Sequence, residues 1–247
     1  MQAFIRTIGI IPRWCLKPLF FFFFACVFEP VISQEVTGEI YGLKTVADIP
    51  GYRKLVEEDS TQKLVDLSLF IPTLRLDIRY ASSNNFLGEP VYRSARAYLN
   101  LAAATALNRV EKELNAKGLG LKIFDAYRPY RVTVIFYEKV RDTVFVASPY
   151  RGSRHNRGAA VDLTLIDMRS GRELRMPTAF DDFTQKAHTN YSKLPRNVIR
   201  NRELLKAVMV KNGFEIYADE WWHYDYKGWR DHPVLDLSFE ELELLMK

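Results

Sequence analysis

The sequence predicts a single α+β domain with a largely antiparallel central sheet flanked by helices, and three observations support this. Helix-like segments come first along the chain, and short strand-like segments follow one another closely toward its end. No internal repeat or low-complexity linker divides the chain after its N-terminal segment. The composition is that of a globular protein, since 48% of the 247 residues are hydrophobic and 26% are charged. These proportions exclude a wholly disordered chain, a collagen and a coiled coil.

Residues 1–33 are predicted to be a secretory signal peptide. The segment Leu19–Phe28 is a run of ten apolar residues, which Glu29 and Pro30 bring to an end. A membrane-spanning helix needs about 20 apolar residues, so the run is too short to be one. Basic residues precede it, at Arg6, Arg13 and Lys17. A basic region followed by a short apolar region is typical of a signal peptide, and we expect cleavage after Ser33.

Cleavage there would release a domain of residues 34–247 into the periplasm, with no stable insertion in the membrane. Two other interpretations remain open for this segment. It could stay attached as an N-terminal anchor that holds the domain at the membrane, facing the periplasm. It could also be a lipoprotein signal ending at Cys26, although Phe stands where such signals favour Leu.

Both cysteines of the chain, Cys15 and Cys26, lie in the predicted signal peptide. A mature domain without cysteine cannot have a disulfide framework, a cysteine nucleophile or a thiolate metal site. The net charge of the full chain is only +5, and the signal peptide removes more basic residues than acidic ones. The sequence therefore gives no case for binding nucleic acid, which requires a clustered basic surface. Catalytic groups must come from His, Asp, Glu, Ser and Arg.

The first half of the domain contains two strand-like segments and a helix. Val65–Tyr80 alternates apolar and polar residues, which predicts one or two strands broken at Pro72. Ala95–Lys117 is rich in Ala and Leu at helical spacing, and Gly118 stands where a helix would end. Leu121–Ala126 is short and apolar, as expected of a buried strand.

The second half alternates between helices and strands. Pro129 can begin a helix that runs to about Phe145. Ser148–Gly158 is a polar loop, and the apolar segment Ala159–Ile166 is a predicted strand. Part of Thr178–Tyr191 is expected to be helical, and Asn197–Lys211 is a clearer helix.

The end of the chain predicts a hairpin and a last helix. Phe214–Tyr217 and Trp221–Tyr226 are close enough to pair as antiparallel strands, and Ser238–Lys247 has helical spacing. Strands joined by such short connections pair antiparallel, which is why a largely antiparallel sheet is expected.

A histidine and an aspartate occur in unusual surroundings between Ser153 and Asp162. His155 lies in a polar loop that contains glycine, whereas Asp162 lies in a strand otherwise made of Ala, Val, Leu and Ile. A carboxylate in such a strand costs several kcal/mol unless it is paired, hydrogen-bonded or bound to a metal. The alternative is that Asp162 and Thr164 share a face of the strand that points to solvent.

A second titratable pair, Glu220 and His223, occurs in the aromatic segment Glu220-Trp221-Trp222-His223-Tyr224. Two neutral imidazoles and one carboxylate are a common zinc-ligand set in catalytic sites, where the fourth position is left for water. A glutamate beside such a metal can take the proton from that water. Taken alone, the pair is better explained as a core histidine and a surface acid.

The two segments together resemble a known family. The pattern S-x-H-x-x-G-x-A-x-D followed by E-x-x-H is similar to that of the zinc D-alanyl-D-alanine dipeptidases. These belong to a wider group of zinc D,D- and L,D-peptidases that act on peptidoglycan peptides. The segment Asp125-Ala126-Tyr127-Arg128-Pro129 resembles the arginine-bearing strand end of the same family. The resemblance extends from about Asp66 to Tyr226.

The resemblance implies a role for each matching residue. His155, Asp162 and His223 would bind one zinc ion on the sheet. Glu220 would be the general base. Arg128 would stabilise the oxyanion of the tetrahedral intermediate, and a fixed cation in a dry cleft can contribute several kcal/mol to this. Ser153 matches a serine that contacts the substrate, although it could merely shape the loop. No role is implied for the remaining histidines, His188 and His232.

Asp181 matches an aspartate that binds the free amino group of the substrate in the dipeptidase branch of the family. An enzyme restricted to dipeptides must recognise both termini, because these alone distinguish a dipeptide from the end of a longer peptide. Pro177 stands where the resemblance predicts glycine, and Asp182 is a neighbouring acid that could serve instead. Either acid could also cap a helix near Phe183–Tyr191.

The expected function is zinc-dependent hydrolysis of D-alanyl-D-alanine in the periplasm, which would release D-alanine during turnover of cell-wall peptides. Salvage of D-alanine is favoured over antibiotic resistance, because resistance would require destroying the dipeptide in the cytoplasm. One alternative is a D,D- or L,D-carboxypeptidase or endopeptidase that acts on peptidoglycan stem peptides. Another is a non-catalytic domain that binds cell-wall peptides. The sequence says nothing about the oligomeric state.

Overall fold

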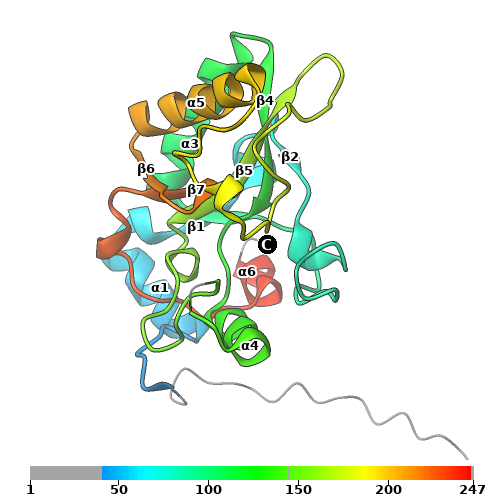
Figure 1. The fold of residues 1–247 in the computed structure, drawn as a ribbon. Coiled ribbons are helices and arrows are strands. Elements are labelled where there is room, and N and C mark those ends of the chain that lie inside the picture. Colours follow the sequence, from blue (N-terminus) through cyan, green and yellow to red (C-terminus); the bar gives the residue numbers. More distant parts are fainter. Residues whose placement is uncertain (1–40, 144, 246–247) are drawn as a thin grey trace, which may run out of the picture. The chain divides into compact units, whose positions relative to one another are not determined.

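A five-stranded sheet is the centre of the computed structural model, which describes residues 41–143 and 145–245 (Figure 1). The strands lie in the order β2-β4-β5-β7-β6. Only β2 and β4 pair in parallel, and the other neighbours are antiparallel. The strand bounds are β2 Arg75–Leu76, β4 Leu119–Asp125, β5 Ala160–Asp167, β6 Phe214–Tyr217 and β7 Glu220–Tyr226. The predicted α+β fold with a largely antiparallel sheet is therefore confirmed.

Helices α3 and α5 lie next to each other and contact the sheet, α3 at β4 and α5 at β5 and β6 (Figure 1). A second, two-stranded sheet pairs β1 (Leu64–Asp66) antiparallel with β3 (Tyr98–Asn100). The helix bounds are α1 Ile49–Glu58, α2 Leu67–Phe70, α3 Leu101–Asn115, α4 Tyr130–Val140, α5 Arg196–Lys211 and α6 Phe239–Leu245. None of the helices among the described residues is long and apolar enough to cross a membrane.

Side chains of the connecting segments explain where the observed elements differ from the expected ones. The helix expected over Ala95–Lys117 begins only at Leu101, because Tyr98–Asn100 pairs with β1 as a strand. The Asn100 side chain then caps the helix by accepting from the Ala103 N–H at 2.8 Å. In Val65–Tyr80 most of the expected strand is missing. Asp66 accepts from the Ser68 N–H and begins a one-turn helix there.

Three further segments differ from the expectation in extent or in kind. In the segment Thr178–Tyr191 the structure has a single short 3-10 turn, Gln185–Ala187. Helix α4 ends at Val140, before the expected Phe145, where Arg141 adopts a left-handed conformation with φ 56°. Helix α1 was not expected, and it begins where the Asp48 carboxylate accepts from the Gly51 N–H at 2.7 Å.

The predicted signal peptide, its cleavage after Ser33 and both cysteines lie outside the described residues. So does the end of the last predicted helix, at residues 246–247.

Gly158 fixes the loop before β5 against the small sheet. Its φ is +59°, and a Cβ atom there would lie 2.4 Å from Leu64 Cδ2 and 3.2 Å from the Asn100 backbone nitrogen. Its carbonyl accepts from the Asn100 N–H at 2.8 Å. The close approach is possible only because glycine has no side chain. It holds the adjacent 3-10 turn His155–Arg157 in place.

We expect Gly158→Ala to lower the free energy of unfolding more than Gly171→Ala does. Both glycines have positive φ, but a Cβ at Gly171 meets no atom within 4 Å. Both variants should lose about 1 kcal/mol for the left-handed conformation, and Gly158→Ala about 1–3 kcal/mol more for overpacking. Urea denaturation measures both, and equal losses would show that the loop is not fixed by this contact.

Candidate active site

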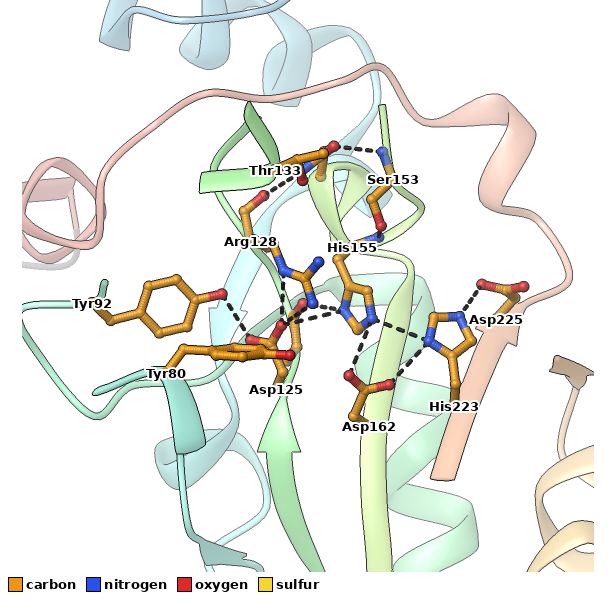
Figure 2. Close-up of polar contacts among 12 residues, drawn as sticks. Tyr80, Tyr92, Asp125, Arg128, Thr133, Ser153, His155, Asp162, His223 and Asp225 are labelled. Atoms are coloured by element: carbon orange, nitrogen blue, oxygen red, sulfur yellow. Dashed lines mark hydrogen bonds and ion pairs between the residues drawn. The ribbon is translucent and has the colours of Figure 1, made fainter. Parts of the chain in front are cut away.

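Three side chains suited to binding a metal ion meet where β4 ends and β5 begins (Figure 2). Asp162 of β5 and His223 of β7 are paired in the sheet, so their side chains lie on the same face, and His155 approaches from the 3-10 turn. His223 Nδ1 lies 3.0 Å from Asp162 Oδ1. His155 Nε2 lies 3.4 Å from Asp162 Oδ2 and 3.2 Å from His223 Nδ1. All three side chains are buried.

Neighbouring acceptors fix how both imidazoles are oriented. His155 Nδ1 donates to the Ala126 carbonyl at 2.6 Å, and His223 Nε2 donates to Asp225 Oδ1 at 3.0 Å. A carbonyl oxygen can only accept, so the proton of His155 is on Nδ1 and the lone pair of Nε2 faces Asp162. This is the arrangement by which metal-binding histidines are held in proteins.

The electrostatics of this group favour a bound positive charge. Burial lowers the pKa of His223, but the carboxylates of Asp225 and Asp162 outweigh burial and hold that pKa well above its usual value. Burial raises the pKa of Asp162, yet His155 and His223 bring it below its usual value. The donor set of two imidazoles and one carboxylate therefore fits a divalent metal ion.

Glu220 reaches this group because of an irregularity between β6 and β7. Ile216 pairs with Tyr224, but the next pair is Tyr217 with Glu220. In a regular strand, residues three apart point to opposite faces. Here Glu220 Oε2 comes within 3.7 Å of His223 Nδ1. Burial raises the pKa of Glu220 to about 7, although the positive charge of His223 opposes the rise.

Arg128 is buried beside the metal-binding group and is held by Asp125. Its Nε and Nη2 donate to Asp125 Oδ2 at 3.0 and 2.7 Å, and the Tyr92 hydroxyl donates to the other carboxylate oxygen at 2.9 Å (Figure 2). A register shift after Ile123 places Asp125, instead of Phe124, opposite Asp162. Arg128 Cζ also lies 4.6 Å from the centre of the Phe136 ring.

Asn156 connects the loop that carries Ser153 to the segment that carries Arg128. Its side-chain amide donates to the Arg128 carbonyl and to Thr133 Oγ1, both at 2.8 Å, and its Oδ1 accepts from the Ser153 N–H at 2.6 Å. Ser153 Oγ accepts from the His155 N–H at 3.2 Å. Ser153 therefore helps to shape the turn of His155.

Asp181 and Asp182 have different environments. The Tyr80 hydroxyl donates to both carboxylate oxygens of Asp181, at 3.1 and 3.2 Å, and the backbone of Asp181 has a left-handed φ of 60°. Burial raises the pKa of Asp181 well above its usual value, and the charge of Asp162 adds to the rise. Asp182 instead accepts from the Thr184 N–H at 2.9 Å. A partly buried acid such as Asp181 ionises more readily when a positive partner is beside it.

The metal-binding group lines one cavity with a volume of about 900 Å³. Its wall includes every residue that the sequence predicted for the site, namely Arg128, Ser153, His155, Asp162, Asp181, Glu220 and His223. The other two histidines lie elsewhere. His188 is near Asp219 at 3.7 Å, and His232 contacts Gln62 at 2.6 Å.

Sequence reasoning missed four residues of this site: Tyr80, Asp125, Arg154 and Asp225. A signal existed for Asp125, because it ends an apolar strand just as Asp162 interrupts one. Asp225 lies two residues after His223, on the same face of a strand, but this spacing alone does not show a contact. Arg154 stands between Ser153 and His155 in the motif, which was a signal that it lies near the site, whereas nothing in the sequence places Tyr80 there.

The chain is similar in sequence to a family of known peptidases. The Peptidase_M15 family model, described as D-ala-D-ala dipeptidase, matches residues 60–234. The D-alanyl-D-alanine dipeptidase of Escherichia coli (strain K12) is 36% identical over 179 residues, which are 72% of this chain and 92% of that protein. The D-alanyl-D-alanine dipeptidase of Enterococcus faecium is 30% identical over 187 residues, 68% of this chain and 91% of that protein.

A solved structure of the LD-carboxypeptidase LdcB aligns with 60% of this chain and 69% of its own. The sequence identity is 22% and the TM-score is 0.37.

We expect Asp125→Asn to lower the free energy of unfolding by about 3–5 kcal/mol, because it leaves the buried Arg128 without a negative partner. The control is Glu89→Gln, which removes the carboxylate from an exposed pair with Lys139 at 2.8 Å. Its loss should stay below about 1 kcal/mol. Chemical denaturation of both variants checks this. A loss below 1 kcal/mol for Asp125→Asn would contradict the pairing.

Proposed function

The chain belongs to the D-ala-D-ala dipeptidase family of metallopeptidases, and from this premise we propose that it hydrolyses D-alanyl-D-alanine with one zinc ion per chain. The observation that carries the proposal is the shared cavity, which brings His155, Asp162 and His223 together with an acid, Glu220, and a buried cation, Arg128. Each of these groups has a use in peptide hydrolysis, and a domain that only binds peptides would not need Glu220.

His155 Nε2, Asp162 and His223 Nδ1 are the atoms that would hold the zinc ion. Three protein ligands are typical of catalytic zinc, whereas structural zinc sites usually have four. When bound, zinc polarises the scissile carbonyl and lowers the pKa of the attacking water to about 7. Asp225 and the Ala126 carbonyl keep the two imidazoles in the tautomers that this binding requires.

Glu220 would take the proton from the attacking water and pass it to the leaving amine. Its pKa of about 7 suits a group that must accept a proton and then release it near neutral pH. Arg128 would donate to the carbonyl oxygen as negative charge develops there. Because Asp125 already fixes the guanidinium, little reorganisation is needed during the reaction.

Asp181 would bind the free amino group of the dipeptide, and Ser153, which lines the same cavity, would also contact the substrate. Burial makes ionisation of Asp181 costly, and an ammonium group is a partner that offsets this cost. Such a requirement for a free amine would exclude longer peptides. The hydroxyl of Tyr80 orients the carboxylate for this contact.

The predicted signal peptide supports a periplasmic setting, in which the enzyme would recover D-alanine from cell-wall peptides. A D,D-carboxypeptidase acting on stem peptides is the second candidate. The cavity volume of about 900 Å³ favours this carboxypeptidase function, since pockets of this size hold ligands much larger than a dipeptide.

Glu220→Gln should retain zinc and lose activity. Without a general base, kcat on D-alanyl-D-alanine should fall by about 10²- to 10⁴-fold. Activity is measured as released D-alanine, and zinc is measured as metal per chain. The control is Glu215→Gln, at an exposed position on the neighbouring strand. If Glu220→Gln kept the wild-type rate, the assignment of the base would be wrong. If it lost zinc, Glu220 would instead belong to the ligand set.

Asp181→Asn should raise KM for D-alanyl-D-alanine by about 10- to 100-fold, the range expected for a charge-assisted hydrogen bond. The wild type should discriminate strongly against the N-acetylated dipeptide, and the variant should discriminate much less. The control is Asp182→Asn, because Asp182 is next in sequence but contacts Thr184. An unchanged preference in Asp181→Asn, or an equal effect in Asp182→Asn, would show that Asp181 does not bind the amine.

A further inference from the structure

A dipeptide carries a carboxylate as well as an amine, and the roles proposed so far give this carboxylate no partner. Four arginines lie on the cavity wall: Arg128, Arg151, Arg154 and Arg157. Arg128 donates to Asp125, and its proposed role is to stabilise the oxyanion. The other three are therefore the candidates to bind the carboxylate.

Arg154 is held in a fixed orientation beside the metal-binding group. Its Nε lies 3.3 Å from Asp225 Oδ2, and its Cζ lies 5.1 Å from the centre of the Trp229 ring and 5.7 Å from that of Tyr217. A guanidinium has five N–H donors, so the contact with Asp225 leaves its terminal nitrogens for another acceptor. The side chain is 37% exposed, which leaves it accessible from the cavity.

Arg154 and Asp181 contact the site from different sides. Asp225 bridges Arg154 to His223 Nε2, whereas the metal-facing atom of His223 is Nδ1. Arg154 is therefore linked, through Asp225, to the nitrogen of His223 that does not contact Asp162. Asp181, in contrast, contacts Tyr80, and the charges of Asp162, Arg128 and Glu220 act on it. A negative and a positive group thus line the cavity that contains the metal-binding atoms, as a zwitterionic substrate would require.

The two remaining arginines are less suitable. Arg157 donates to the His232 carbonyl, and burial lowers its pKa. Its guanidinium is thus directed toward the backbone of the C-terminal segment. Arg151 is exposed in the turn that precedes Gly152. Of the three, only Arg154 is linked through a carboxylate to a residue that would bind the metal.

We propose that Arg154 binds the C-terminal carboxylate of the dipeptide and so provides the second of the two contacts that restrict the enzyme to free dipeptides. The inference rests on the proposed dipeptidase function. A guanidinium can donate to both oxygens of a carboxylate in a planar, paired contact. The rings of Tyr217 and Trp229 hold the plane of the guanidinium, and Asp225 holds its Nε.

The test compares D-alanyl-D-alanine with its C-terminal amide in the wild type and in Arg154→Gln. The wild type should have a kcat/KM about 10- to 100-fold lower for the amide, as expected for the loss of a charge-assisted contact. Arg154→Gln should lower kcat/KM for the acid by the same factor, mainly through KM, and should leave that for the amide nearly unchanged. Arg151→Gln is the matched control, and it should keep the wild-type preference.

Two further readouts separate this inference from its alternatives. Zinc per chain in Arg154→Gln should equal that of the wild type, and a loss of zinc would mean that Arg154 acts only by supporting Asp225 and His223. Binding of the acid and the amide to zinc-loaded Glu220→Gln, with and without Arg154→Gln, tests the contact without turnover. Binding that depends on both the carboxylate and Arg154 supports the inference even if D-alanyl-D-alanine is not the substrate. Equal effects of Arg154→Gln on acid and amide would overturn it, even if the dipeptidase function holds.

Discussion

The buried carboxylate of Asp162 is the constraint on which the whole site depends. It lies inside the central sheet, where an isolated charge would cost several kcal/mol. Pairing with β7 supplies His223, and the turn fixed by Gly158 supplies His155. Because both imidazoles are also hydrogen-bonded on their outer nitrogens, the three inner atoms converge where they could together hold a metal ion. The contacts that stabilise Asp162 inside the sheet are therefore the same ones that form the metal-binding group.

Two departures from regular strand geometry place the groups around this centre. The shift after Ile123 turns Asp125 toward Asp162, and Asp125 then fixes Arg128. The irregular pairing of β7 with β6 brings Glu220 to the side of His223. In a regular sheet, both acids would point away from the cavity. The irregular backbone is therefore what brings the carboxyl group of Glu220 and the guanidinium of Arg128 to the same three residues.

Much of the sheet could be predicted from the sequence, because its strands are apolar, short and separated by clear turn residues. The start of α3 could not be predicted. Tyr98–Asn100, just before it, forms a strand because it pairs with β1, which is distant in the sequence. The resemblance carried by the motifs predicted the residues that the structure brings together in the cavity, and Asp181 is one of them. The contacts that distinguish Asp181 from Asp182, and the contact of Arg154 with Asp225, depend on three-dimensional neighbours that spacing does not determine.

The central claim is that this cavity hydrolyses a free D,D-dipeptide with a metal ion. The most direct measurement is the release of D-alanine by residues 34–247 from D-alanyl-D-alanine and from a pentapeptide that ends in the same dipeptide, each with and without a chelator. The account predicts cleavage of the dipeptide alone, lost with the chelator and restored by zinc. Cleavage of the pentapeptide would contradict the claim and indicate a carboxypeptidase, and cleavage that survives the chelator would contradict the metal-dependent mechanism.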